Sequence, residues 1–418
     1  MARVLVLTLL FEPDGVSTAR LMGAVAEDLQ RRGHDVTVLT TTPHYNVDVE
    51  AQARQPLSRR WGRILQSSNY AGIGVLHVLM PRKGRSRALR VAAWLWFHAV
   101  STVAGLVALP WRPDVVLTPS PPLTMGIAAW LLAARWRAPF IYNVQEIHPD
   151  ILVSLGMIRP GLGLRILEAL ERFIYGRAGA ITVAVPSAAR RLLEKGVPQD
   201  RVRVVPNFVD AEALTPEPRP NEFSRIHGLD GAFVVTYAGN FGPGQQLGAV
   251  LEAARLLADE PGLRVLLVGG GIEWTRIADE AAGLGNVRVL PYQPFARMAA
   301  IYGSTDVALV PLAGGAGLQA LPSKVYQIMG CGLPLVAIAD AGSDLATLIE
   351  EAGSGAVATP GSAESLAETL RAAARHPDRW RAMGRAGRAH VVQHYNRNQV
   401  AERYDSIVRG LATSRVTT

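Results

Sequence analysis

The feature that most constrains this chain is an alternation of short buried strands and amphipathic helices that occurs twice along it. The first series has an apolar run at residues 3–10, a helix from about Ser17 and a strand at 35–40, which form a βαβ unit. A second series restarts at Phe233–Gly239, after a proline-rich stretch at 215–220. Since 418 residues exceed one ordinary core, the sequence predicts two α/β domains with parallel sheets.

Charge and cysteine content narrow the partners and the compartment. The net charge of +8 favours an anionic partner, which could be nucleotide phosphates, anionic lipid or nucleic acid. The single cysteine, Cys331, excludes an intramolecular disulfide and fits a reducing cytosol, where we expect a packed thiol. The apolar run at 4–11 is short and ends in Glu12-Pro13, so we expect a buried strand there and no signal peptide.

A basic cluster followed by an uncharged stretch indicates a membrane-facing element. The stretch Val91–Trp111 carries no formal charge, but a bilayer span there would put strands of one sheet on opposite sides of the membrane. We therefore predict a helix half in the domain and half in the lipid interface, with a fully buried core helix as the alternative. Nucleic acid is disfavoured because no aromatic-rich groove accompanies the basic residues. The predicted acceptor and membrane residues are His44, Arg82, Lys83, Arg85, Arg87, Arg90, Trp94 and Trp96.

The segment Leu321–Pro334 is predicted to be a helix that begins at Pro322, followed by a strand. Unpaired amides at a helix start and the cation of Lys324 would suit a diphosphate. An ordinary surface helix with a solvated lysine is the alternative.

Polar loops follow several predicted strands, where ligands collect in open α/β sheets. Glu146 and His148 come directly after the strand 140–144, and they could orient and partly deprotonate an acceptor hydroxyl. A loop whose polar groups only cap the next helix is the alternative. The nine histidines show no metal-ligand spacing, so no metal site is predicted.

Several of these segments resemble the retaining glycosyltransferase family 4, in the branch that builds colanic-acid-like, O-antigen-like and exopolysaccharide polymers. The resemblance lies in Gly33–Tyr45, Gln145–Asp150, Arg203–Asp210, Tyr237–Leu247 and Leu321–Pro334. It implies the GT-B fold, in which two Rossmann-like domains with parallel sheets face each other across a cleft. The implied acceptor domain is 1–210 and the donor domain 211–396, with a C-terminal helix at 397–412 that packs back on the first domain.

The resemblance also assigns residues to roles. Glu146 and His148 become the catalytic candidates, although His148 replaces the usual aromatic residue. Gln319 and Gln327 stand where the family has two glutamates, and an amide can hydrogen-bond a hydroxyl but cannot act as a base. The implied donor-binding residues are Gly15, Asn240, Gln245, Tyr292, Gln319, Pro322, Ser323, Lys324 and Gln327.

The implied function is a retaining, metal-independent glycosyltransferase. It would use a UDP- or GDP-linked sugar as co-substrate, no other cofactor, and an acceptor that is polyprenyl-linked or otherwise lipid-linked. We expect it at the anionic inner face of the cell membrane, as a peripheral cytoplasmic protein without nucleic acid partners. A nucleotide-sugar epimerase of the same fold and a non-catalytic, membrane-associated partner of a polysaccharide assembly are the alternatives.

Overall fold

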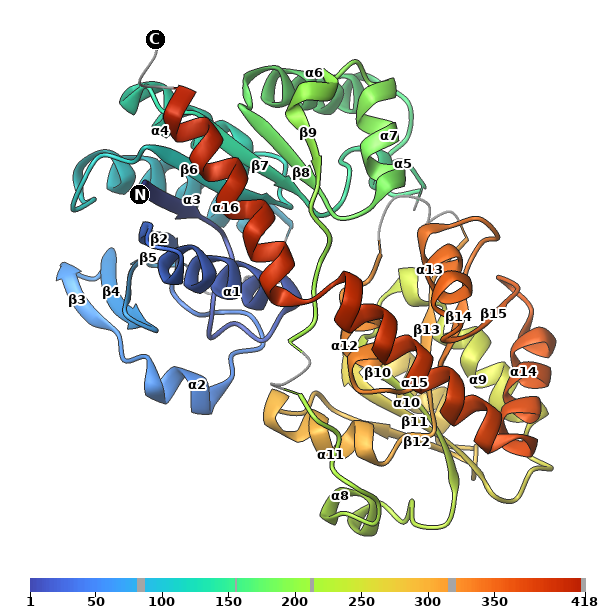
Figure 1. Cartoon of the computed structure of the whole chain (residues 1–418). Coiled ribbons are helices and arrows are strands. Elements are labelled where there is room, and N and C mark those ends of the chain that lie inside the picture. Colours follow the sequence, from blue (N-terminus) through green and yellow to red (C-terminus); the bar gives the residue numbers. More distant parts are fainter. Residues whose placement is uncertain (81–86, 155, 211–213, 315–320, 415–418) are drawn as a thin grey trace. The chain divides into compact units, whose positions relative to one another are not determined.

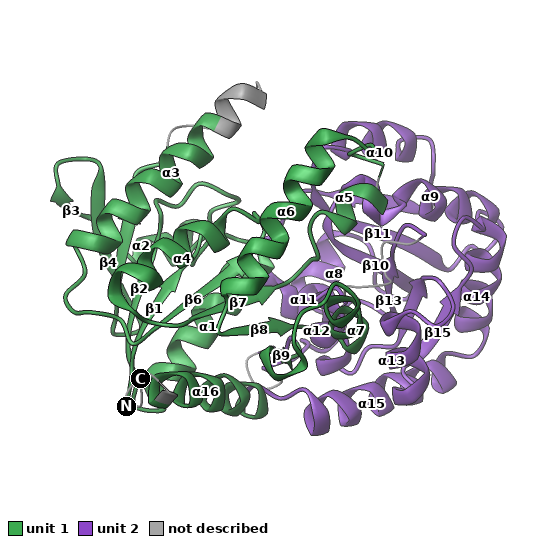
Figure 2. Cartoon of the chain, turned by 90° about the horizontal axis from the view of Figure 1, so that it is seen from above, with its two compact units in different colours: residues 1–206, 398–418 green, residues 207–397 purple. Residues whose placement is uncertain are grey.

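The computed structural model describes residues 1–80, 87–154, 156–210, 214–314 and 321–414. The chain forms two compact units, which are coloured separately in Figure 2. Unit 1 comprises Met1–Pro206 together with Asn398–Thr418, and unit 2 comprises Asn207–Arg397. The change of unit therefore falls between Pro206 and Asn207, in the segment Arg203–Asp210.

Unit 1 is built on a nine-stranded sheet with the order β3-β4-β5-β2-β1-β6-β7-β8-β9. The strands from β5 to β9 run parallel, whereas β4 is antiparallel to both of its neighbours. The strand bounds are β1 (Arg3–Leu7), β2 (Asp35–Thr41), β3 (Ser58–Trp61), β4 (Leu65–Tyr70), β5 (Ile73–Val78), β6 (Val115–Ser120), β7 (Phe140–Val144), β8 (Ala180–Val183) and β9 (Val202–Val204).

Helices cover both faces of this sheet, because its central strands are apolar on both sides. Figures 1 and 2 show α3, α4 and α6 on one face and α1 with α16 on the other. The bounds are α1 (Ser17–Arg31), α2 (Val49–Arg54), α3 (Arg87–Val107), α4 (Met125–Trp136), α5 (Asp150–Ser154), α6 (Leu162–Arg177), α7 (Pro186–Glu194) and α16 (Arg397–Ser414).

The last helix, α16, packs on unit 1 through buried polar contacts. The buried amide of Asn143 on β7 donates to the hydroxyl of Tyr404 at 2.9 Å. The ring of His34, also buried, lies 2.6 Å from a carboxylate oxygen of Asp405. The return of the C-terminal helix to the first domain is thus present, as predicted.

Unit 2 has a six-stranded, wholly parallel sheet with the order β12-β11-β10-β13-β14-β15. Its main core lies under α9, α14 and α10, and a smaller core under α8 and α11 covers the other face of the sheet. The strands are β10 (Phe233–Asn240), β11 (Leu263–Gly270), β12 (Val287–Leu290), β13 (Val307–Pro311), β14 (Leu335–Ile338) and β15 (Gly355–Ala358). The helices are α8 (Glu222–Ile226), α9 (Leu247–Leu256), α10 (Trp274–Ala281), α11 (Met298–Gly303), α12 (Lys324–Gly330), α13 (Asp344–Ala352), α14 (Ala363–Arg375) and α15 (Pro377–His394).

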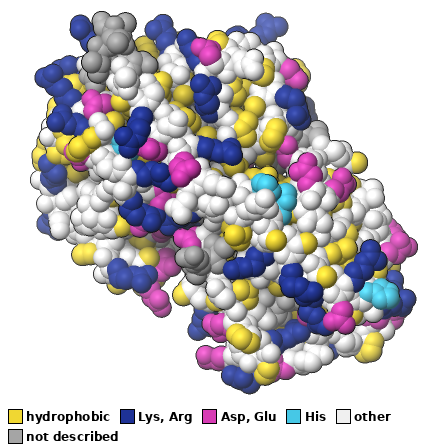
Figure 3. Space-filling model, in the orientation of Figure 1, with side chains coloured by type: hydrophobic (Ala, Val, Ile, Leu, Met, Phe, Trp, Pro, Cys, Tyr) yellow, Lys and Arg dark blue, Asp and Glu magenta, His cyan; other side chains and the backbone are white. Residues whose placement is uncertain are grey.

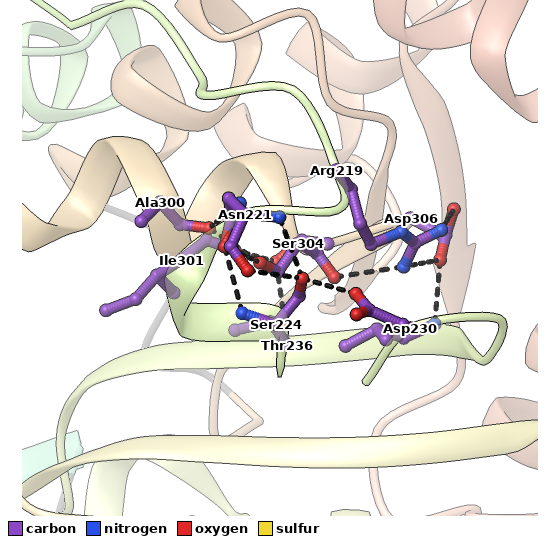
Figure 4. Close-up of polar contacts among 11 residues, drawn as sticks. Arg219, Asn221, Ser224, Asp230, Thr236, Ala300, Ile301, Ser304 and Asp306 are labelled. Atoms are coloured by element: carbon purple, nitrogen blue, oxygen red, sulfur yellow. Dashed lines mark hydrogen bonds and ion pairs between the residues drawn. The ribbon is translucent and has the colours of Figure 1, made fainter. Parts of the chain in front are cut away.

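A polar cluster fixes the segment that enters unit 2 to the start of its sheet (Figure 4). The guanidinium of Arg219 donates to both carboxylate oxygens of Asp306, at 3.0 and 3.1 Å. Asp306 also accepts the amide of Val234 at 2.8 Å, and the side chain of Asn221 caps α8. Because each of these polar groups is paired, the cluster holds the starts of β10 and β13 side by side.

One sequence-based expectation needs correction. The helix of the Leu321–Pro334 segment begins at Lys324, two residues after the predicted start, and Pro322 lies outside its first turn. The helix α3 (Arg87–Val107) covers most of the apolar stretch Val91–Trp111, in which a helix was predicted. Across the described ranges, no helix combines the length and hydrophobicity that crossing a bilayer requires.

Candidate functional site

The order in which strands are added to the sheet of unit 2 reverses between β10 and β13. From β10 the order proceeds outward to β11 and β12, and from β13 it proceeds outward to β14 and β15. Such a reversal is called a topological switch point. Ligands of open α/β sheets bind there, beyond the carboxyl ends of the strands, because the loops diverge. A hydrogen bond of 2.9 Å from Ala313 N to Gly244 O joins the loops after β13 and β10. The sheet order therefore locates a candidate ligand site within unit 2.

Glycines allow unusually close backbone packing at this edge. A Cβ atom on Gly269, at the end of β11, would lie 1.8 Å from the carbonyl oxygen of Gly239 at the end of β10. A Cβ atom on Gly271 would lie 2.4 Å from Phe241 O. Glycine is therefore required at positions 269 and 271 by the contact between the chain segments at the ends of β10 and β11.

Lys324 brings a positive charge to the same place. Its Nζ lies 4.0 Å from the centroid of the Tyr237 ring, and a Cβ atom on Gly239 would lie 2.7 Å from that Nζ. Burial lowers the pKa of the Lys324 ammonium to about 7. Within the described part of the chain, no carboxylate forms an ion pair with it. A bound phosphate would supply the missing counter-charge and would raise this pKa again.

The other donor-site candidates of this unit lie on the surrounding loops. Tyr292 follows β12, is 41% exposed, and donates its hydroxyl to the side-chain oxygen of Asn240 at 3.4 Å. Its ring packs on Gly270, where a Cβ atom would lie 3.0 Å from the ring. Gln245 belongs to a 3-10 turn, and Gln246 after it has a φ of +42°. Glycine adopts this left-handed conformation more readily than glutamine does.

The remaining predicted donor residues surround the start of α12. Pro322, Ser323 and Gln327 are half-buried, and Pro322 O accepts a hydrogen bond from Val325 N at 3.0 Å. Gln319 lies outside the described residues. Cys331, just after α12, is buried, and burial raises the pKa of its thiol to about 12, as suits the packed thiol that was predicted.

Unit 1 has a corresponding switch point between β1 and β6. The buried carboxylate of Asp14 there accepts the amides of His44 and Tyr45, both at 2.8 Å. The Nδ1 atom of His44 lies 3.1 Å from Thr42 O. A Cβ atom on Gly15 would lie 2.3 Å from Asn46 O. The loops after β1 and β2 are therefore tied together, and the contact that requires Gly15 to be glycine is internal.

Glu146 and His148 follow β7 as predicted, and their contact with each other is a local one. Glu146 is exposed, and the ring Nδ1 of His148 lies 3.3 Å from the backbone oxygen of Glu146. The nearby Asp150 accepts hydrogen bonds from Lys195 at 2.6 Å and Arg191 at 2.7 Å. Burial by itself would raise the pKa of Asp150, but these two hydrogen bonds lower it overall. Asp150 is thus a structural anchor, whereas Glu146 and His148 remain candidates.

Glu12, in the loop after β1, has a shifted pKa and was not among the site residues predicted from the sequence. Burial raises the pKa of its carboxyl to about 7, and the nearby charge of Arg20 offsets this effect in part. Its Cγ and the hydroxyl of Tyr70 both border Gly23, where a Cβ atom would lie 3.1 and 2.9 Å from them. An acidic residue soon after the first apolar run was the available signal.

The basic and aromatic residues assigned to a membrane face are described only in part. Arg82, Lys83 and Arg85 lie outside the described residues, and Arg87 and Arg90 lie in the first turns of α3. Trp94 and Trp96 are 43% and 39% exposed. On the face drawn in Figure 3, basic side chains are scattered and acidic ones lie among them. No group of three potential metal ligands occurs over the residues that the structure describes.

Comparisons with known proteins agree with this architecture. A model of the "Glycosyl transferase 4-like domain" matches residues 18–207, and a model of "Glycosyl transferases group 1" matches residues 232–376. The chain is 27% identical to the putative colanic acid biosynthesis glycosyl transferase WcaI of Escherichia coli, over 89% of this chain and 92% of that protein. It is 25% identical to the probable glycosyltransferase WbjE of Pseudomonas aeruginosa, over 69% and 73% of the two chains.

Solved structures show the same fold at low sequence identity. Sucrose-phosphate synthase from Thermosynechococcus elongatus superposes with a TM-score of 0.76 and 16% identity, over 99% of this chain and all of that one. Anabaena HepE in complex with UDP-glucose gives a TM-score of 0.72 and 15% identity, over 99% and 100%. The predicted GT-B fold is confirmed. Since the two domain models match successive parts of the chain, the protein has the domains of a glycosyltransferase, a glycosyl transferase 4-like domain followed by a domain of glycosyl transferases group 1.

Proposed function

We propose that the protein is a retaining glycosyltransferase that moves a sugar from a nucleotide-diphosphate sugar to a lipid-linked acceptor in the synthesis of a cell-surface polysaccharide or glycolipid. The observation that carries this proposal is the ammonium of Lys324, placed beside Gly239 at the switch point of unit 2. A diphosphate suits that charge and the glycine-rich backbone around it. The complex of Anabaena HepE with UDP-glucose supports the type of donor, and the naming of WcaI for colanic acid biosynthesis supports the type of pathway.

In the proposed reaction the bond between the anomeric carbon and the diphosphate oxygen breaks, and its electron pair leaves with the diphosphate. Lys324 and neighbouring backbone amides stabilise the charge that develops on this leaving group, without a metal ion. The acceptor hydroxyl forms the new bond on the same face of the sugar, so the anomeric configuration is retained. We assign His44, Glu146 and His148 to the acceptor, with Glu146 or His148 taking the hydroxyl proton.

The two glutamines that replace the family glutamates shape the expectation for the donor. Gln319 and Gln327 can donate to and accept from sugar hydroxyls, but they contribute no negative charge. We infer that donor binding is retained with altered sugar preference. The same replacements are the one observation that favours a non-catalytic partner of a polysaccharide assembly. An epimerase would convert the donor without an acceptor.

We further propose that the protein works as a peripheral protein on the anionic inner face of the cell membrane. The support is the exposed pair Trp94 and Trp96 on α3, which follows the basic cluster of the sequence. Indole rings favour the interface between lipid and water, and arginine favours anionic headgroups.

Two measurements test the function. Calorimetric titration with UDP and GDP measures donor binding, and loss of binding in Lys324→Met would tie it to the proposed site. A radiolabelled-donor assay with extracted polyprenyl-phosphate lipids, followed by NMR of the product, then measures transfer and anomeric outcome. Nucleotide binding without any transfer would favour the non-catalytic partner, donor conversion without acceptor the epimerase, and absence of nucleotide binding would overturn the proposal.

A further inference from the structure

An apolar groove lies at the margin of unit 1, beside the carboxyl end of β5, where Leu65 pairs with Val78. It has a volume of about 280 Å³ and lies between α3 and the hairpin formed by β3 and β4. Its lining residues are Trp61, Ile64 and Leu65 of the hairpin and Trp96, Ala99, Val100, Val103 and Ala104 of α3.

The walls of this groove are apolar and partly open to solvent. Trp61, Ile64 and Val103 keep 48%, 48% and 56% of their surface exposed. The indole N–H of Trp96 donates to Leu79 O at 2.9 Å, so the polar atom of this ring is already paired. An occupant with unpaired backbone groups would lose hydrogen bonds to water here, whereas a hydrocarbon chain has none to lose.

The hairpin, which forms one rim of the groove, carries positive charge. Arg59, Arg60 and Arg63 flank Trp61 on the hairpin, and all three are exposed. Over the described residues, no ion pair with an acidic side chain neutralises them. Arginine beside exposed aromatic and aliphatic side chains is the composition that binds anionic lipid surfaces. The membrane face predicted from the sequence comprised α3 and its preceding basic cluster, and it did not include this hairpin.

We propose that the groove binds one hydrocarbon chain of an anionic membrane phospholipid, while Arg59, Arg60 and Arg63 bind the phosphate headgroup. The proposal rests on the peripheral membrane association proposed above. It adds a second membrane-binding element, the β3–β4 hairpin, and a defined slot for a lipid chain. The charge on the rim selects an anionic lipid, and the apolar lining selects the chain rather than a peptide.

The test uses the full chain and vesicles of phosphatidylcholine with phosphatidylglycerol that carries a photoactivatable diazirine in its acyl chain. We expect crosslinks in residues 58–65 and 96–104 after irradiation, mapped by mass spectrometry. Ala99→Trp fills the groove at an exposed position and should reduce these crosslinks about tenfold while vesicle binding persists. Val103→Ser, which makes the wall of the groove polar without filling the groove, should also reduce these crosslinks.

Charge variants test the headgroup contact separately. Arg59→Glu with Arg60→Glu should weaken binding to the anionic vesicles about thirtyfold or more. Arg379→Glu with Arg385→Glu, at exposed positions of α15, makes the same charge change and should alter binding less than about twofold. Circular dichroism and thermal unfolding of each variant check that the fold is retained.

The outcomes separate the two proposals. If the wild type binds anionic vesicles but its crosslinks lie elsewhere, or if Ala99→Trp and Val103→Ser leave them unchanged, the groove assignment is wrong and the membrane association stands. If the wild type does not bind anionic vesicles, both are wrong.

Discussion

Two lysines, one in each unit, show how the chain treats a positive charge in two different ways. Lys195 of unit 1 donates to Asp150 at 2.6 Å and to Glu171 at 2.7 Å. Lys324 of unit 2 lies against the Tyr237 ring and has no carboxylate partner among the described residues. A charge that is already paired stabilises the fold, whereas a charge without a partner is available to a ligand. The comparison therefore supports the proposal that the nucleotide diphosphate binds to unit 2.

The substitution Lys324→Met is the strongest test of this contrast between the two lysines. Lys324→Met should lower the kcat/KM for the nucleotide sugar by about 10²–10³-fold, since a charge at the leaving diphosphate is lost. The melting temperature should stay equal or rise, because the substitution also removes an ammonium whose charged form is disfavoured by its partly buried position. Steady-state kinetics and thermal unfolding measure both effects. A variant with wild-type kinetics would remove Lys324 from the donor site.

The matched change in unit 1 should have the opposite profile. Lys195→Met leaves Asp150 and the buried Glu171 without their shared counter-ion, and we expect a loss of about 3 kcal/mol in the free energy of unfolding. Urea unfolding measures the loss, and calorimetry with UDP should show an unchanged affinity. If nucleotide affinity fell as well, the distinction between the two lysines would not hold.

The pH dependence of nucleotide binding sharpens the comparison. The pKa of Lys324 in the free protein is about 7, and a bound diphosphate would raise it, so the charged form binds and the neutral form binds weakly. Affinity for UDP should therefore fall as the pH rises, about fivefold between pH 7 and pH 8. Calorimetric titrations at several pH values test this. The same slope in Lys324→Met would assign the titration to another group.

The smallest expected effect concerns Glu12 in unit 1. Burial raises the pKa of its carboxyl to about 7, so the folded state binds more protons than the unfolded state between pH 4.5 and 7. The stability that this group contributes is present below pH 4.5 and is lost as the pH rises through 7. Since Glu12 is only half-buried, Glu12→Gln should stabilise by about 1 kcal/mol at pH 8 and hardly at all at pH 4. Urea unfolding at both pH values tests the sign.

The sequence predicted the elements whose character is local. The strand Phe140–Val144 has the predicted bounds, because it is an apolar run between clear boundaries. Residues 46–80 drew no prediction. Their strands β3 and β4 are short and mostly polar, with β3 exposed and β4 mostly half-buried, and they form by antiparallel pairing next to β5. Such pairing depends on the sheet that is already present rather than on the segment itself.

The candidate site was predictable in part. Lys324 could be proposed from its motif, and Tyr292 from its position in the resemblance to family 4. The packing of Lys324 on Tyr237 and the contact of Gly269 with Gly239 could not, because they join strands that are far apart in the sequence. The groove of unit 1 has the same origin, since its walls come from a hairpin and a helix about 30 residues further along the chain.

The position of α16 has a consequence for how the protein is made. The segment Asn398–Thr418 belongs to unit 1, so the ribosome releases the piece that completes unit 1 only after all of unit 2 has been synthesised. Until then the amide of Asn143 lacks Tyr404, and the ring of His34 lacks Asp405. Domains usually fold in the order in which they emerge, but here the first to emerge is the last that can be finished. A nascent chain halted before residue 398 should therefore carry a folded unit 2 and an incomplete unit 1.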